Sequence, residues 1–191
     1  MNPASSERSE SPPSSFAELR TASLFTIRPA RPEDAEVLAN LVRELAIYEK
    51  LEHLARAMPD DFRRHLFGPR PAAEAALAEV DGEPAGFALW FSNFSTFRGQ
   101  PGLYLEDIFV RPEFRGRGIG KALLASLARL AVERGCGRLE WSVLDWNAPS
   151  IAFYRALGAR PMDEWTVYRL DDEPLRRLAG LARESGLSTP V

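Results

Sequence analysis

The chain has 191 residues, of which 45% are hydrophobic and 27% are charged, a composition typical of a globular protein of about one domain. A single Cys and two His exclude a disulfide framework and a His/Cys metal cage; an oxygen-ligand site stays open, but no metal is expected. The net charge of -3 argues against a nucleic acid or an anionic membrane as partner, and the absence of an 18-residue apolar run argues against a membrane span.

The first segment, residues 1–23, contains seven Ser and three Pro and almost no large apolar side chains. Such a composition cannot bury enough apolar surface to offset its ordering entropy, so we expect a disordered tail. The segment also lacks the basic and apolar parts of a secretory signal, and we therefore expect a cytoplasmic protein. The folded domain is expected over 24–170, with a partly helical tail over 171–191.

Strand-like and helix-like hydrophobic patterns alternate from residue 24 onward. Asp81-Gly82 between two apolar runs predicts a β-hairpin, and Gly135 and Gly158 are expected to end helices. Strand patterns cover 24–28, 76–80, 85–91, 103–110, 138–144 and 165–170. Helical patterns cover 32–48, 59–67, 118–134, 149–157 and, marginally, the segment after Pro174, with a loop over 92–102. These elements together predict one mixed α/β domain.

A glycine-rich turn is the most informative segment; it follows a predicted strand and opens a predicted helix, with the sequence Arg115-Gly116-Arg117-Gly118-Ile119-Gly120-Lys121. Glycine permits close approach of the backbone, and converging N–H groups at a helix N-terminus bind anions. Its three basic side chains add positive charge, so a pyrophosphate is the natural ligand. A P-loop fails at Arg115 and Ala122, and a Rossmann fingerprint fails at Lys121. Taken alone, the pattern also fits a plain strand-to-helix turn.

With its flanks, this turn resembles the GNAT superfamily of acetyl-CoA-dependent N-acetyltransferases, whose R/Q-x-x-G-x-G/A motif matches Arg115, Gly118 and Gly120. The runs 44–49, 103–110 and 145–154 are similar to the diamine and thialysine acetyltransferase subgroup. The resemblance implies an α/β fold with a mostly antiparallel twisted sheet that is splayed into a V and flanked by helices. It also implies acetyl-CoA as co-substrate between the splayed strands, a small-molecule amine as acceptor, and a homodimer.

The same resemblance assigns roles to individual residues. The coenzyme is expected at Ile108, Phe109, Val110, Arg115, Gly116, Arg117, Gly118, Ile119, Gly120, Lys121, Asn147 and Ser150. The acceptor amine is expected at Tyr48, Glu49, Glu106, Asp107, Asp163 and Trp165, a set with the acidic character that suits a cationic substrate.

The chemistry requires a base, an oxyanion donor and an acid. A lysine-like amine has a pKa of about 10.4, so reaching its neutral form at pH 7 costs about 4.6 kcal/mol. We expect Glu106 to be the base, acting through a water. Regular alternation places Asp107 on the opposite face of its strand unless a bulge intervenes, so Asp107 stays a second candidate. The N–H of Ile108 or Phe109 is expected to stabilise the oxyanion, and Tyr154 matches the family's acid position.

The identity of the amine is less constrained. Arg98, in the segment 94–99, would repel a long polycation, which favours a small or lysine-like amine over spermidine. Two other hypotheses stay open: a catalytically idle acyl-CoA-binding module, and a transferase that acts on a protein or peptide N-terminus.

Overall fold

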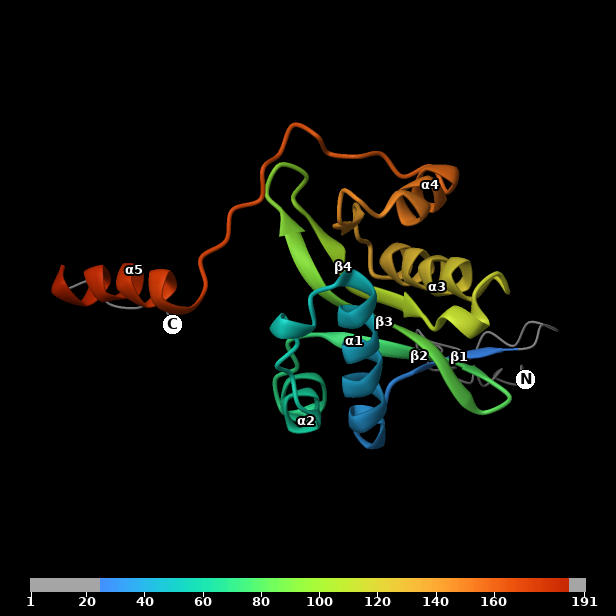
Figure 1. Ribbon diagram of the computed structural model, residues 1–191. Helices are drawn as coiled ribbons and strands as arrows, with labels where there is room; N and C mark the ends of the chain where they lie inside the picture. Colours follow the sequence, from blue (N-terminus) through green and yellow to red (C-terminus); the bar gives the residue numbers. More distant parts are fainter. Residues whose placement is uncertain (1–24, 186–191) are drawn as a thin grey trace, which may run out of the picture. The chain divides into compact units, whose positions relative to one another are not determined.

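The computed structural model describes residues 25–185 (Figure 1), so the Ser/Pro-rich segment lies outside the described residues. Contacts divide the chain into two compact units, the first ending at Ser142 and the second beginning at Val143. Within residues 25–185, no helix combines the length and the apolar character that crossing a membrane requires.

The first unit is built on a five-stranded sheet in the order of the chain. Its strands are β1 (Thr26–Pro29), β2 (Glu74–Val80), β3 (Glu83–Ser95), β4 (Gln100–Val110) and β5 (Leu139–Trp141). The first three pairings are antiparallel, whereas β5 runs parallel to β4. The predicted class, a mixed and mostly antiparallel sheet, is confirmed.

Two hairpins decide how the sheet is connected. Asp81 and Gly82 both have positive φ, 51° and 82°, which matches the right-handed twist of the flanking strands and confirms the predicted hairpin. The loop predicted over 92–102 is too long, because β3 and β4 stay paired as far as Ser95 and Gln100 and only residues 96–99 form a turn. The polar composition of that segment reflects the exposed end of a hairpin and its turn.

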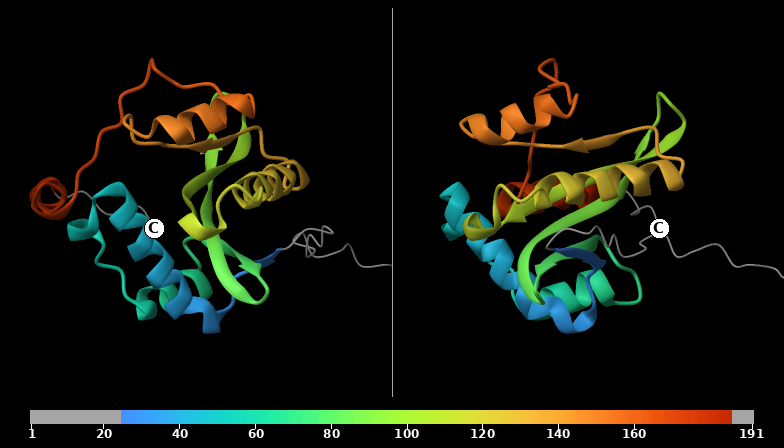
Figure 2. Two further views of the ribbon diagram at one scale, coloured as in Figure 1. Left: turned by 45° about the vertical axis from the view of Figure 1, so that its right-hand side comes forward. Right: turned by 90° about the vertical axis from the view of Figure 1, so that its right-hand side faces the viewer.

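Helices cover both faces of the sheet. Figures 1 and 2 show α1 (Ala35–Glu49) and α2 (Pro59–Phe67) over one face and α3 (Ile119–Glu133) over the other. A buried cluster joins the first two helices to the sheet through Leu38, Leu41, Leu45, Phe62, Ala75, Leu77, Phe87 and Phe109. Alternation places Trp90, Leu103 and Leu105 on the other face, where α3 buries Ile119, Leu123, Leu127 and Leu130. Short 3₁₀ turns, η1 (Pro32–Asp34), η2 (Glu52–Leu54) and η3 (Pro112–Phe114), complete the unit.

Two arginine ion pairs fix the helical layer to the sheet. Arg28 of β1 donates to both oxygens of the buried Asp34 carboxylate at 2.7 and 2.9 Å and also binds Glu79, and its hydrogen bonds lower the pKa of Asp34. Arg111, which follows β4, forms a two-point contact with Glu44 of α1 at 2.8 and 2.7 Å. The second pair holds the α1 segment that precedes Tyr48 and Glu49 against the end of β4.

The second unit contains α4 (Ala148–Ala156) and α5 (Asp172–Glu184). Both helices were predicted, and Gly158, with φ 86°, follows α4 as expected. The strand predicted over 165–170 is wrong, because those residues have no regular structure and Val167 and Tyr168 are 81% and 91% exposed. An alternating pattern makes a strand only where a neighbouring strand accepts its hydrogen bonds. β5 is also shorter than the predicted 138–144, and its pairing with β4 covers three residues.

Candidate active site

A β-bulge in the middle of β4 defines the candidate site. On β3, Trp90 lies opposite Leu105 and the next residue back, Leu89, lies opposite Asp107, so Glu106 is an extra residue in β4. A bulge reverses the alternation that follows it. Leu103 and Leu105 therefore face α3, whereas Asp107 and Phe109 face the side that α1 covers. The sequence left open whether a bulge brings Glu106 and Asp107 onto one face of the strand, and the structure contains such a bulge.

Three carboxylates meet at this bulge, and two of them act on the third. Asp107 is half-buried, Glu106 is exposed, and Glu49 is at the C-terminal end of α1. Burial, together with the charges of Glu106 and Glu49, raises the pKa of Asp107 from 3.8 to about 6. Burial also raises the pKa of Glu49. The structure thus brings together two segments that are far apart in the sequence and moves the pKa of Asp107 toward neutral pH.

Aromatic and apolar side chains continue the same face of the sheet. Tyr104 lies opposite Phe91, and their rings stack with centroids 5.2 Å apart. The Tyr104 hydroxyl is 2.7 Å from the Ser142 hydroxyl. Phe91, Tyr104 and Leu89 are all only half-buried, so this part of the sheet is partly open next to Asp107. Sequence reasoning missed these three residues; the alternation along β3 and β4, corrected for the bulge, identifies them.

The glycine-rich turn has the geometry of an anion site. Gly116 and Gly118 have φ of 76° and 83°, and Gly118 is the N-cap of α3. The first helical hydrogen bond is donated by Ala122, so the N–H groups of the three preceding residues point out of the helix end. A Cβ added at either glycine would meet nothing within 4 Å, so the space in front of the turn is open to a ligand. The turn fits a pyrophosphate, as its sequence predicts.

The arginines of the turn lie against aromatic rings. The Arg115 guanidinium is 4.6 Å from the centre of the Tyr48 ring and 5.7 Å from that of Phe109, and its Nε donates to the Val110 carbonyl at 2.8 Å. Arg117 lies over Phe114 at 5.4 Å. Arg115 therefore connects a predicted acceptor residue, Tyr48, with two predicted coenzyme residues.

Arg98 also has a defined position. Its Nη1 donates to the Gly137 carbonyl at 2.6 Å, which ties the β3–β4 turn to the segment before β5.

The second unit carries the remaining candidates. Asn147 is buried, and its side chain accepts a hydrogen bond from the Ser150 N–H at 3.3 Å, so Asn147 caps the N-terminus of α4. Tyr154 is half-buried on α4 and contacts Phe153 with ring centroids 5.5 Å apart. Asp163 and Trp165 are exposed in an irregular segment. All five of these predicted site residues belong to the second unit: Asn147, Ser150, Tyr154, Asp163 and Trp165.

No metal site accompanies this arrangement in the described part of the chain. Over residues 25–185, no group of three or more His, Cys, Asp or Glu side chains is arranged to hold a metal ion. The chemically distinctive features of the first unit are thus two: the glycine-rich turn and the acidic trio, which consists of Glu49, Glu106 and Asp107.

Comparison with known proteins identifies the family. The model of the acetyltransferase (GNAT) family matches residues 38–159. The chain belongs to the GNAT acetyltransferase family. Among curated relatives of this acetyltransferase, the thialysine N-epsilon-acetyltransferase of Bos taurus is 38% identical, over 81% of this chain and 96% of its own. The L-ornithine N5-acetyltransferase of Arabidopsis thaliana is 32% identical, over 80% of this chain and 86% of its own.

Solved structures agree with this assignment. An integron cassette protein from the mobile metagenome of V. cholerae superposes with a TM-score of 0.71 at 26% identity, covering 83% of this acetyltransferase and 99% of that chain. The aminoglycoside N-acetyltransferase AAC(6')-Iy in complex with CoA gives a TM-score of 0.64 at 26% identity, covering 80% and 98%. The family, the fold class and the N-acetyltransferase class predicted from the sequence are confirmed.

Proposed function

We propose that this enzyme transfers the acetyl group of acetyl-CoA directly to a primary amine of a small molecule, namely a diamine, thialysine or a lysine-like amine. The observation that carries the proposal is the trio Glu49, Glu106 and Asp107 at the β4 bulge, which suits a cationic amine and includes a carboxylate with a pKa of about 6. The activities named for relatives from Bos taurus and Arabidopsis thaliana, on thialysine and ornithine, support this class of acceptor.

The glycine-rich turn fits the coenzyme. Backbone N–H groups of Ile119, Gly120 and Lys121 bind the pyrophosphate at the N-terminus of α3, and the open space at Gly116 and Gly118 admits it. β4 continues for five residues beyond its pairing with β5, so the backbone of Ile108, Phe109 and Val110 is available to the pantetheine arm. Acetyl-CoA supplies the activated thioester.

Asp107 takes the proton of the ammonium group, directly or through a water. A base works best when its pKa lies near the working pH. Raising a carboxylate pKa from 3.8 to about 6 reduces the uphill cost of accepting that proton by about 3 kcal/mol, yet leaves Asp107 mostly ionised at pH 7. Burial raises the pKa of Asp107 most, and Glu106, the first candidate from the sequence, acts here mainly by adding its charge to that effect.

Two further groups complete the chemistry. The N–H of Ile108 or Phe109 donates to the thioester oxygen as negative charge develops on it. Tyr154 protonates the leaving thiolate, whose reference pKa of about 8.5 needs only a modest acid. Asn147 supports this step by capping the helix that carries Tyr154, where it accepts from the Ser150 N–H.

The alternatives predict different outcomes. An idle acyl-CoA-binding module would bind the coenzyme without turnover, and a peptide acetyltransferase would prefer an acceptor with a free N-terminus over a small amine. A homodimer and a cytoplasmic location stay predictions from resemblance and composition.

The decisive experiment measures CoA release from acetyl-CoA across a panel of amines. The panel contains diamines, thialysine, lysine, ornithine, an aminoglycoside and a short peptide. Turnover that is highest with a small amine, and that is lost in Asp107→Asn, supports the proposal. An enzyme that binds acetyl-CoA and acetylates no small amine refutes it.

A further inference from the structure

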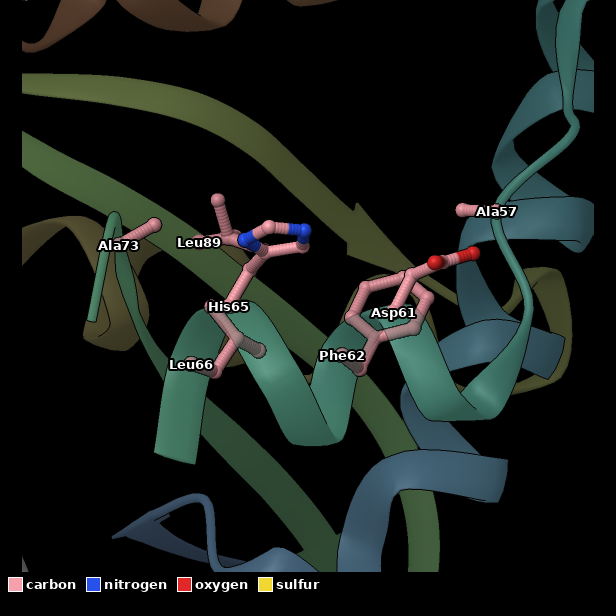
Figure 3. A pocket seen from close by; sticks show the side chains of 7 residues that line it. All are labelled: Ala57, Asp61, Phe62, His65, Leu66, Ala73 and Leu89. Carbon is pink, nitrogen blue, oxygen red and sulfur yellow. The ribbon is translucent and has the colours of Figure 1, made fainter. Parts of the chain in front are cut away.

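A pocket between α2 and the sheet has no role in the function described so far. It has a volume of about 210 Å³, and the surface that lines it is apolar throughout. Figure 3 shows Ala73 and Ala57 at its two ends and Leu89 of β3 in its wall. Asp61 also lines the pocket, but its carboxylate accepts from the Met58 N–H at 2.9 Å and points toward Ala57. The pocket therefore suits a carbon chain.

Leu89 connects this pocket to the candidate site. It lies directly opposite Asp107 in the β3–β4 pairing, and the Cβ atoms of residues so paired are about 5 Å apart on the same face. Both side chains are half-buried. An acceptor whose nitrogen is at Asp107 can therefore extend an apolar tail over Leu89 into the pocket without leaving this face of the sheet.

The size of the pocket sets the length of that tail. An apolar cavity of about 150 Å³ holds one benzene molecule, so a volume of about 210 Å³ has room for roughly six carbon atoms. In n-hexylamine, bonds of about 1.5 Å span roughly 7 Å from the nitrogen to the terminal carbon, which is enough to cross Leu89. Each methylene group that leaves water for the pocket strengthens binding by up to about fourfold.

A second charged group does not fit in the same place. Burying an ammonium or a carboxylate group against apolar surface is strongly unfavourable without a partner. Diamines and lysine-like amines therefore leave their second charged group outside the pocket. We propose that the pocket binds the apolar tail of a primary monoamine whose nitrogen is at Asp107, so that n-alkylamines of about six carbons are a further class of acceptor. This inference rests on the proposed amine acetylation.

A series of n-alkylamines measures the contribution of the pocket. We expect kcat/KM with acetyl-CoA to rise at least tenfold from ethylamine to n-hexylamine, because further methylene groups leave water. Ala73→Leu, which fills one end of the pocket, is expected to remove most of this gain and to change kcat/KM for ethylamine less than twofold. Ala72→Leu is the matched control and keeps the gain, because Ala72 is exposed and does not line the pocket. Absence of the gain in the parent enzyme, or its persistence in Ala73→Leu, overturns the proposal.

Two amines of equal length give an independent comparison. n-Hexylamine and 1,5-diaminopentane have chains of the same number of heavy atoms and differ only in the terminal methyl or amino group. Ala57→Leu narrows the other end of the pocket at an exposed position, where the fold tolerates a larger side chain. We expect it to lower kcat/KM for n-hexylamine at least fivefold and for 1,5-diaminopentane less than twofold. Equal losses for the two amines overturn the proposal.

A binding measurement separates this inference from the acetyl transfer itself. In calorimetry on the enzyme with bound CoA, n-hexylamine is expected to bind at least tenfold more tightly than ethylamine, with a more negative heat-capacity change because its tail is buried. Ala73→Leu is expected to bind the two amines about equally. Equal affinities in the parent enzyme overturn the pocket assignment. An enzyme without turnover that still shows the difference between the two amines refutes the proposed function alone.

Discussion

Asp107→Asn is expected to make the protein more stable and much less active. The carboxamide has nearly the shape of the carboxylate but cannot ionise. General bases contribute roughly 10²–10⁴-fold to rate, so we expect kcat/KM for the preferred amine to fall at least 100-fold at pH 7.5. The affinity for acetyl-CoA is expected to change less than twofold, because the coenzyme contacts proposed here do not use this side chain.

The stability gain follows from the raised pKa. With a pKa of 3.8 in the unfolded chain and about 6 in the folded one, Asp107 binds its proton more tightly in the folded state. Its ionisation therefore destabilises the fold, by about 3 kcal/mol when the pH is above 6, and this cost disappears as the pH falls toward 4. The Asn variant does not carry this cost of ionisation. Its free energy of unfolding therefore exceeds that of the parent protein most at pH 7–8, and the difference fades between pH 6 and 4.

Thermal unfolding and kinetics over pH 4–8 measure both effects. For a chain of this length, 1 kcal/mol corresponds to roughly 2–4 °C in Tm, so the gain at pH 7.5 is measurable. The parent kcat/KM should fall as the pH drops through about 6. Glu106→Gln is the matched control: removing its charge should lower the pKa of Asp107, moving the acid limb to lower pH while most activity stays. An inactive Glu106→Gln beside an active Asp107→Asn would refute the reasoning and make Glu106 the base.

Three further changes test other parts of the molecule. Tyr154→Phe is expected to keep the affinity for acetyl-CoA and to lower kcat about 100-fold, since it removes the acid of the thiolate; Tyr168→Phe, at an exposed position, serves as control, and an unchanged kcat would remove Tyr154 from its role. Gly118→Asp is expected to weaken acetyl-CoA binding, measured by calorimetry, at least tenfold more than Gly118→Asn does. Both changes strain the same positive φ, and only Asp adds negative charge beside the pyrophosphate. Equal affinities would contradict a pyrophosphate site at the glycine-rich turn. Glu44→Gln is expected to lower the free energy of unfolding by about 1 kcal/mol, because it breaks the two-point contact with Arg111, whereas Glu36→Gln, in a more exposed pair, should change it less; equal losses in urea unfolding would show that Glu44 contributes no more than a surface charge.

Local chemistry made much of the fold predictable. Pro32, Pro59, Gly135 and Gly158 mark helix ends that the structure confirms, and Asp81-Gly82 forms the expected hairpin because few other residues accept two successive positive φ angles. The predictions were wrong where a strand depends on pairing with a neighbouring strand. Most of the polar segment 92–102 becomes strand because two strands pair on either side of a turn over 96–99, and 165–170 stays irregular although its side chains alternate.

The sequence by itself determined the family, and it predicted the coenzyme turn and the acidic candidates, since these depend on residue types at fixed spacing. Only the tertiary structure decided how the acids are arranged. The bulge at Glu106 arises from the pairing register of two strands, and it places Asp107 beside Leu89 on the α1 side of the sheet. The pKa of Asp107 then follows from burial and from Glu49, a residue 58 positions earlier in the sequence. Spacing along the chain cannot encode either effect, because both depend on which surfaces the folded chain brings together.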